Sequence, residues 1–463
     1  MAFLLLCDVF AYGDDAETLA CNAVPVLILH TQPPTHPHAH APPTRIALCS
    51  STIDTNLFFA QFPHFTNGGL ADLVVVTSTR VPLIKFTFHA VHVDLLFASV
   101  DLAEPPSNDD LLRDDFLFRV SENSRATVNG IRTILEIYRR LRLPQEDYAC
   151  VLRAVKYWAT RRQVYGNLYT FPNGVCLAIM VARASQLCPV QDPSALLKFF
   201  FALYVRWLSR STPTAPITIV MAEDTTTAMT AVPGMTRAWD ATRDAADLLP
   251  ILNPARPTVN AAHTVGRSGL QLFYAELRRA HRLLQDHSAT ADAPPYRQLW
   301  QPYNVLQEYR YFVSVHIACV HASSTACESL LNVWKGFIES KLRIFLYALE
   351  CVAEVRPFPQ SVVDKPSDEI VGGGVTLRRA SRAFFFGVRR GNSELQQSCF
   401  AEAFKEFRYA VAEGTTPPYG FERDEHSMLG PWFSFFAKEQ TAAPGTALHA
   451  LQAACAEAVS GAF

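Results

Sequence analysis

A single carboxylate inside the apolar run 91–99 is the feature that most constrains this chain. The run reads Val-His-Val-Asp-Leu-Leu-Phe-Ala-Ser, and its β-branched and apolar residues predict a strand. A carboxylate in a buried strand is costly unless a cation, a basic side chain or hydrogen bonds compensate it. Asp94 therefore predicts a compensating partner elsewhere in the chain.

The N-terminal run 13–19 supplies two further carboxylates, Asp15 and Glu17. On a strand, residues two apart share a face. Three carboxylates from two strands could hold two divalent ions about 3.5–4 Å apart, the arrangement that phosphoryl transfer requires. The same residues also fit solvated turn acids or salt-bridged strand ends, so the residues alone leave both interpretations open.

Composition is typical of a folded protein with several domains, because 49% of the 463 residues are hydrophobic and 18% are charged. The net charge of −2 provides no general basic field, so nucleic-acid binding would need a local groove. Eleven cysteines without a Cys-x-x-Cys pair predict reduced thiols in an intracellular protein. No run approaches the roughly 20 apolar residues of a membrane helix, so we expect no membrane association.

The first region is rich in predicted strands, with candidates at 70–76, 81–88 and 91–99. A stretch rich in Pro and His at 31–44 interrupts it. We interpret this stretch as an inserted loop, with metal chelation by its histidines as the less favoured alternative.

In the rest of the chain the predicted secondary structure changes twice. Apolar periodicity predicts a helical middle region, and alternating strands and helices then predict a ferredoxin-like sandwich, so the fold class is α+β. The last residues predict a tail with a candidate helix at 447–458. The predicted helices are 124–141, 148–162, 174–187, 195–208, 268–286, 326–350 and 392–413, and the later strands are 309–320 and 383–388.

Eight short strings occur in an order and at spacings that resemble the nuclear poly(A) polymerases, which are DNA polymerase beta-like nucleotidyltransferases. The resemblance covers most of residues 10–410. The strings are VPLIK (81–85), VDLLFA (93–98), VNGIR (128–132), LRAVKYWA (152–159), VYGN (164–167), GVCLAIMVAR (174–183), PARP (254–257) and ESKLRI (339–344).

The resemblance implies a mixed-sheet nucleotidyltransferase domain at 1–105, a helical central domain at 106–298, an RNA-binding domain of RNA-recognition type at 299–415 and a tail at 416–463. It implies template-free addition of AMP from ATP to an RNA 3′ hydroxyl, as in polyadenylation of pre-mRNA. It further implies a nuclear monomer with cleavage and polyadenylation factors as candidate partners, although the chain carries no clear nuclear-localisation signal.

The resemblance also implies the site residues. Asp15, Glu17 and Asp94 would be the catalytic carboxylates and would bind two Mg²⁺ or Mn²⁺ ions. The implied nucleotide contacts are Lys156 and Tyr165 at the triphosphate, Asn129, Asn167, Gly174 and Val175 at the ribose and base, and Leu83 beside the adenine.

The chain departs from the family at several positions. No Gly-Ser pair precedes Asp15, so we expect a catalytic domain that lacks its N-terminal part. Glu17 and Asn173 replace residues that are usually Asp and Gly. A catalytically impaired RNA-binding scaffold is therefore an alternative. A relative that adds uridine is less favoured, because residues 309–413 match the nuclear poly(A) enzymes.

Overall fold

The chain divides into two compact units. Unit 1 contains residues 1–149, 217–244 and 252–260, and unit 2 contains residues 150–216, 245–251 and 261–463. The computed structural model describes residues 27–30, 44–50, 55–65, 70–76, 81–88, 91–101, 106–209, 215–219, 232–233, 235–285, 296–321, 323–363, 367–371, 375–390, 397–413, 428–437 and 451–452. This division groups the chain differently from the four domains expected from sequence, whose boundaries stay a prediction.

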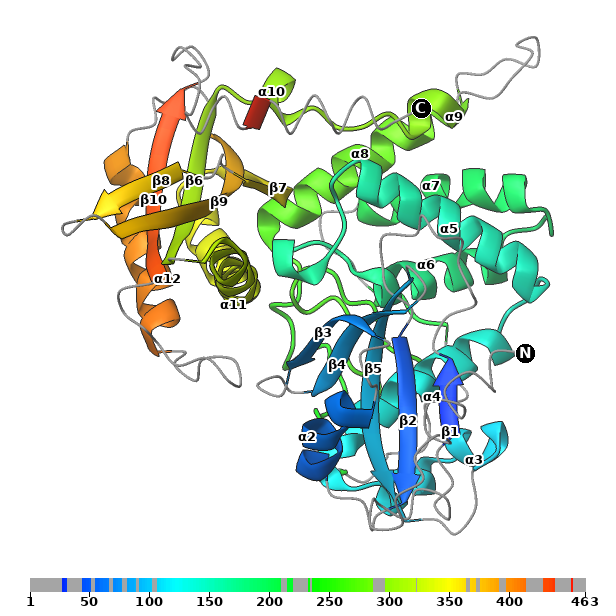
Figure 1. Cartoon of the computed structure of the whole chain (residues 1–463). Coiled ribbons are helices and arrows are strands. Elements are labelled where there is room, and N and C mark those ends of the chain that lie inside the picture. The colour runs from blue at the N-terminus through cyan, green and yellow to red at the C-terminus, as the bar shows by residue number, and fades with distance from the viewer. Residues whose placement is uncertain are drawn as a thin grey trace, which may run out of the picture. The chain divides into compact units, whose positions relative to one another are not determined.

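Unit 1 is built on a five-stranded mixed sheet with the strand order β1-β2-β5-β4-β3 (Figure 1). Strands β2 and β5 run parallel, and the other neighbours are antiparallel. The predicted strand around Asp94 is confirmed as β5, which is the central strand. The strands are β1 (Leu27–His30), β2 (Thr44–Ser50), β3 (Ala71–Val76), β4 (Leu83–Phe88) and β5 (Val91–Val100).

Different helices cover the two faces of this sheet, because alternate residues of β5 point to opposite sides. Leu95 and Phe97 pack in a buried cluster with Phe59 of α2. Ala98 packs in a second cluster with Val128 of α4. The helices of unit 1 are α2 (Thr55–Phe65), α3 (Asn108–Leu112) and α4 (Arg125–Arg139), with short 3₁₀ turns at Asp114–Arg119 and Glu122–Ser124.

Residues 252–260 belong to unit 1 and are held against α4 by polar contacts. Arg132 of α4 is almost fully buried and donates hydrogen bonds to the Arg256 carbonyl (2.6 Å) and to Asp114 (2.7 Å). Thr133 donates to the Asn253 side chain at 2.6 Å. These contacts explain why residues 252–260 belong to unit 1, although unit 2 residues separate them from α4 in the sequence.

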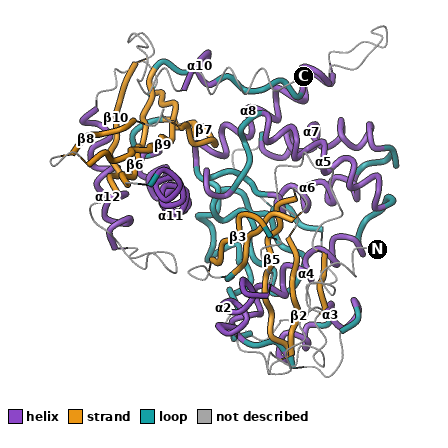
Figure 2. The backbone as a smooth tube through the Cα atoms, viewed as in Figure 1, coloured by secondary structure: helices purple, strands orange, loops and turns teal. Residues whose placement is uncertain are grey.

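The helical part of unit 2 confirms the helices predicted from apolar periodicity to within a few residues, and Figure 2 shows it as a group of long helices. The structure has α5 (Gln145–Arg161), which starts before the unit boundary, α6 (Gly174–Leu187), α7 (Pro193–Leu208), α8 (Arg267–Gln285), α9 (Tyr296–Leu299) and α10 (Val305–Glu308), with a 3₁₀ turn at Asn167–Tyr169.

The C-terminal part of unit 2 confirms the predicted ferredoxin-like arrangement. Its main elements follow the order β-α-β-β-α-β, and its antiparallel sheet has the order β10-β6-β9-β7, with β8 added beside β9. The elements are β6 (Tyr311–His321), α11 (Ser324–Glu350), β7 (Glu354–Val363), β8 (Ser367–Val371), β9 (Val375–Arg389), a 3₁₀ turn at Gln397–Phe400, α12 (Ala401–Glu413) and β10 (Met428–Ala437).

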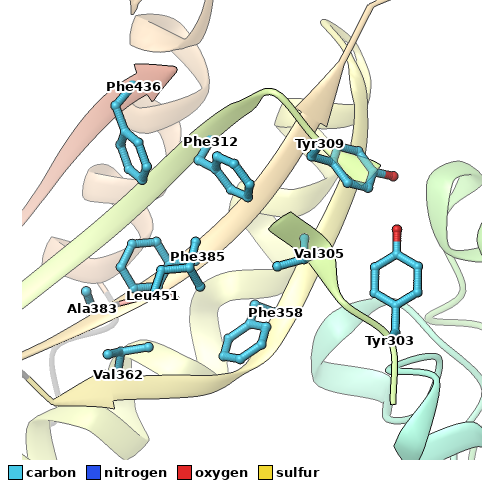
Figure 3. Close-up of a cluster of buried hydrophobic side chains, with 10 residues drawn as sticks. All are labelled: Tyr303, Val305, Tyr309, Phe312, Phe358, Val362, Ala383, Phe385, Phe436 and Leu451. Atoms are coloured by element: carbon cyan, nitrogen blue, oxygen red, sulfur yellow. The ribbon is translucent and has the colours of Figure 1, made fainter. Parts of the chain in front are cut away.

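Both faces of this sheet carry buried apolar side chains. Phe345 of α11 packs edge-on against Phe386 on one face. The neighbouring residue, Phe385, points to the other face, where it is buried together with Phe312 and Leu451 (Figure 3). The region expected to be a tail therefore contributes a full strand, β10, and the apolar residue Leu451.

The structure also describes the state of the cysteines and the apolar length of the helices. The cysteines in the described part of the chain are all free thiols. Among the helices described, none has an apolar stretch long enough to cross a membrane. Asp15, Glu17 and most of the Pro/His-rich stretch 31–44 lie outside the described residues.

Candidate active site

Asp94 lies on the face of the unit 1 sheet that packs against α4. It shares this face of β5 with Leu96 and Ala98, which belong to the cluster around α4 or pack against it. Lys85 of β4 is directly opposite Asp94 in the antiparallel pair. Burial raises the pKa of the Asp94 carboxyl, whereas Lys85 and His92 act to lower it.

No ion pair or hydrogen bond reaches the Asp94 carboxylate from the residues that the structure describes. Among the described residues, Lys85 and His92 therefore favour the charged form of Asp94 without an ion pair or hydrogen bond to it. A divalent cation fits such a carboxylate, because it favours the charged form that burial disfavours. The described residues contain no cluster of three His, Cys, Asp or Glu side chains that could hold a metal ion. The two other predicted ligands, Asp15 and Glu17, lie outside the described residues.

Leu83 and Asn129 are the other two predicted site residues in unit 1. Leu83 pairs with Leu96 across β4 and β5, so it shares the face of Asp94. Asn129 is buried in α4, and its side-chain oxygen accepts a hydrogen bond from Arg132 at 3.2 Å. That oxygen already has a donor, so only the amide nitrogen of Asn129 has no hydrogen-bond partner among the described residues.

Lys156 is the partly buried lysine of α5 in unit 2. The helix buries Val155, Trp158 and Ala159, and these neighbours remove Lys156 from much of the solvent. Burial lowers the pKa of its ammonium group to about 8. Among the described residues, no carboxylate lies within ion-pair distance of Lys156. An anion bound here would supply the missing countercharge.

Tyr165 and Gly174 meet at Lys156. A Cβ atom at position 174 would lie 2.8 Å from the Tyr165 hydroxyl oxygen and 3.5 Å from Lys156 Nζ. Only glycine avoids that crowding, so Gly174 allows the hydroxyl and the ammonium to approach the start of α6. Burial also raises the pKa of Tyr165, so its phenol is a neutral hydrogen-bond donor at physiological pH.

Asn173 fixes the first turn of α6 and was not predicted as a functional residue. Its side-chain oxygen accepts hydrogen bonds from the backbone N–H groups of Val175 and Cys176, both at 3.1 Å. The side chain of Val175 remains exposed beside this cap. This capping role could have been predicted from the sequence, because Asn is among the preferred residues immediately before a helix.

The loop between α5 and α6 presents Asn167 to solvent. Gly166 has a positive φ of 108° and uses both of its backbone polar groups: its N–H donates to the Pro172 carbonyl, and its carbonyl accepts from Phe171, each at 3.1 Å. Tyr169 donates a hydrogen bond to Glu339 of α11 at 2.6 Å. These contacts hold the loop, and with it Asn167, at a defined place between the two helices.

The structure thus brings Lys156, Tyr165 and Gly174 together in unit 2, with Val175 in the same turn. In unit 1 it brings Leu83 and Asp94 to one sheet face. The unit 2 group combines a cation, a phenolic donor, a glycine at the start of a helix and an exposed apolar side chain. This combination can bind a phosphate-bearing ligand with an apolar ring system.

Two family models match the chain. The model for the poly(A) polymerase nucleotidyltransferase domain matches residues 37–141, and the model for the poly(A) polymerase central domain matches residues 147–302. The first match includes β5 with Asp94, and the second includes Lys156, Tyr165 and Gly174.

Individual relatives agree with these models. The chain is 29% identical to nuclear poly(A) polymerase 2 of Arabidopsis thaliana over 353 residues, which are 74% of this chain and 40% of the relative. It is 30% identical to poly(A) polymerase PAPalpha of Candida albicans over 323 residues, or 66% and 54% of the two chains.

The chain spans about half the length of the curated relatives it matches. Among solved structures, one of Cid1, an RNA terminal uridylyl transferase, is similar with a TM-score of 0.40 and 16% identity, over 57% of this chain and 81% of that chain. Two successive family models and the sequence relatives lead to one conclusion: the chain belongs to the poly(A) polymerase family.

Proposed function

We propose that this chain is a polynucleotide adenylyltransferase that extends RNA 3′ ends with AMP from ATP. The RNA 3′ oxygen attacks the α-phosphorus of ATP, the bond to the β-phosphate oxygen breaks, and pyrophosphate leaves. The reaction needs no template strand. Such a site must bind a triphosphate, orient the 3′ hydroxyl and stabilise negative charge that spreads over the phosphate oxygens.

The observation that carries this proposal is the unpaired cation of Lys156 beside the Tyr165 hydroxyl. A partly buried ammonium without a carboxylate partner is unfavourable in the free protein. The triphosphate of ATP would supply that partner, and the Tyr165 hydroxyl would donate to a second phosphate oxygen. Gly174, Val175 and Asn167 would border the ribose and base, and we propose Asn129 and Leu83 as further nucleotide contacts.

Divalent ions complete the proposal. Asp94 would hold them together with Asp15 and Glu17, and the ions, Mg²⁺ or Mn²⁺, would acidify the RNA 3′ hydroxyl and neutralise the leaving pyrophosphate. The partly buried Asp94 carboxylate, which forms no ion pair or hydrogen bond among the described residues, supports this assignment.

The relatives named nuclear poly(A) polymerases support a role in polyadenylation of pre-mRNA in the nucleus. We propose that the chain acts there as a monomer, with cleavage and polyadenylation factors as partners. Within it, we propose a catalytic domain at 1–105, a central domain at 106–298, an RNA-binding domain at 299–415 and a tail from 416.

Primer extension tests the proposal. Purified protein is incubated with an oligo(A) RNA, Mg²⁺ or Mn²⁺, and each of the four nucleoside triphosphates separately. We expect extension with ATP. Asp94→Ala should reduce the rate by about 1,000-fold or more, because bound metal supplies several kcal/mol of transition-state stabilisation. The matched control is Asp101→Ala, which removes an exposed carboxylate just after β5 and should leave the rate unchanged.

Other outcomes identify the alternatives. Extension with UTP in preference to ATP would overturn adenylyl specificity. A folded protein that binds RNA but extends it with no nucleotide would behave as the impaired scaffold. Equal activity of wild type and Asp94→Ala would remove Asp94 from the catalytic site.

A further inference from the structure

Three aromatic side chains in unit 2 form an array that the nucleotide site does not use. Tyr296 and Trp300, at and just after α9, are stacked with ring centroids 5.4 Å apart and an angle of 17° between the ring planes. Tyr157 of α5 meets Trp300 edge-on at 6.0 Å. Tyr157 is 43% exposed, so one end of the array is open to solvent.

Arginines flank this array. The Arg161 guanidinium lies 5.9 Å from the centre of the Tyr157 ring, and its Nε donates to the Trp300 carbonyl at 3.4 Å. Arg153 lies one helical turn before Tyr157 on the same face of α5 and is exposed. No hydrogen bond or ion pair engages Arg153 among the described residues. We call Arg153, Tyr157, Arg161, Tyr296 and Trp300 the aromatic–arginine surface.

The local charge around this surface is strongly positive, in contrast to the net charge of −2 for the chain. Glu146 and Asp147 lie in the first turn of α5, but in the rest of α5, in α8 and in residues 296–304 the only acidic residue is Glu276. Glu276 is buried and forms a two-bond ion pair with Arg162, at 2.8 and 3.0 Å, so it does not offset the exposed arginines. Arg279 of α8 adds a further cation and donates to the Gln298 carbonyl of α9 at 2.6 Å.

On the ferredoxin-like sheet, Trp432 stacks on His316 and lies 5.9 Å from the Arg379 guanidinium, but Trp432 is half-buried, whereas Tyr157 is exposed. The aromatic residues at the centre of this sheet, Phe312 and Phe385, are fully buried in the cluster that includes Leu451 (Figure 3). A base could stack on them only if that cluster opened. At α5 and α9, by contrast, an exposed tyrosine, a stacked aromatic pair and the unengaged Arg153 occur together.

We propose that the aromatic–arginine surface binds single-stranded RNA. A base would stack on Tyr157, whose ring is supported by the Trp300–Tyr296 stack, and Arg153 and Arg161 would contact the adjoining phosphates. Every base has a π-face, so the surface would be tolerant of sequence. Tyr157 directly follows Lys156 on α5, so RNA bound here would lie near the triphosphate contact that we propose for Lys156. The inference rests on the proposed function only in naming RNA as the polymer.

Fluorescence anisotropy tests this surface without requiring turnover. Labelled oligo(A) RNAs of about 5 and about 20 nucleotides are titrated in the absence of ATP, because a single-stranded site typically covers about 4–16 nucleotides. Tyr157→Ala should weaken binding of the longer RNA about 5-fold or more. Arg153→Glu should weaken it and reduce its salt dependence, because a phosphate contact is lost.

The matched controls are Phe118→Ala and Arg119→Glu, which replace an exposed phenylalanine and the exposed arginine beside it in the 3₁₀ turn Asp114–Arg119. They should bind both RNAs as wild type does. Unchanged binding in both surface variants would overturn the proposal, as would equal losses in the control pair. If Tyr157→Ala does not fold, Arg153→Glu decides the question. If wild type extends no primer but its RNA binding still depends on Tyr157 and Arg153, the proposed function fails and this surface stands.

Discussion

At the scale of single residues, Lys156 carries the charge of the unit 2 site, because no carboxylate lies within ion-pair distance of its partly buried ammonium among the described residues. The motif strings pointed to Lys156, Tyr165 and Gly174, and the structure brings these three together. The lowered pKa of Lys156 could not be predicted, because it depends on burial beside α6 and on the absence of a carboxylate, which are properties of the packed structure.

Lys156→Met should weaken ATP binding and increase the stability of the folded protein at pH 7. A pKa near 8, below the 10.5 of an ordinary lysine, means that the folded protein binds fewer protons than the unfolded chain between these two values. The stability of wild type should therefore rise as pH increases from 8 to 10.5, and this rise should disappear in Lys156→Met. At pH 7 the variant should be more stable by on the order of 1–3 kcal/mol, because a buried charge has been removed.

Urea unfolding at pH 7 and pH 9.5 measures this change, and equilibrium binding measures the affinity for ATP. ATP affinity should fall at least about 10-fold in the variant, and in wild type it should weaken as pH rises past 8. Lys198→Met, which removes an exposed lysine of α7, is the control and should change neither quantity. A variant that binds ATP normally would show that Lys156 is a structural lysine.

At the scale of elements, periodicity predicted the long helices of unit 2 well but missed the strands β7, β8 and β10. Helix α6 begins and ends at the predicted residues, because an uninterrupted apolar pattern follows an Asn cap. Strand β10 was missed because it contains Pro431, which argues against a strand. The structure accommodates Pro431 because β10 is an edge strand and its pairing with β6 shifts register between Leu429 and Trp432.

The cap of α6 leads to a prediction about the nucleotide site. Asn173→Ala should lower stability by about 1 kcal/mol, because two backbone N–H groups lose their acceptor. It should also raise the KM for ATP more than it lowers kcat, because Asn173 positions Gly174 and Val175 without touching the reacting atoms.

Asn173→Asp keeps an acceptor and should restore the stability. The comparison variant Asp192→Ala removes the equivalent cap of α7 and should lower stability by a similar amount with no change in KM. Denaturation curves and steady-state kinetics on all three variants separate these effects. An unchanged KM in Asn173→Ala would limit Asn173 to a structural role.

At the scale of the whole molecule, the division into units could not be predicted from contiguous sequence boundaries. Unit 1 recruits residues 252–260 through Arg132 and Thr133, contacts that no local pattern encodes. Within unit 2, a buried ion cluster joins the helices to the ferredoxin-like sheet. Glu276 of α8 pairs with Arg162 and lies 3.5 Å from the guanidinium of Arg356 on β7.

Tyr303 also belongs to this cluster. The centre of the Tyr303 ring lies 3.4 Å from the Arg356 guanidinium and 5.2 Å from the Arg162 guanidinium. Arg356 also donates to the Arg162 carbonyl at 2.6 Å. The buried charges of this cluster are therefore compensated only while the helices and the sheet of unit 2 pack against each other. We expect the two parts to unfold together.

Glu276→Gln tests that coupling. Removing the only carboxylate of the cluster leaves two buried guanidinium groups without a countercharge, which should lower the free energy of unfolding by about 3–5 kcal/mol. Glu402→Gln removes a carboxylate that forms an exposed ion pair with Lys405 on α12, and this control should cost no more than about 1 kcal/mol. Urea unfolding is followed by far-ultraviolet circular dichroism and by tryptophan fluorescence. Wild type should give one transition for unit 2 by both probes, whereas two separate transitions would show that the helices and the sheet are independent folding units.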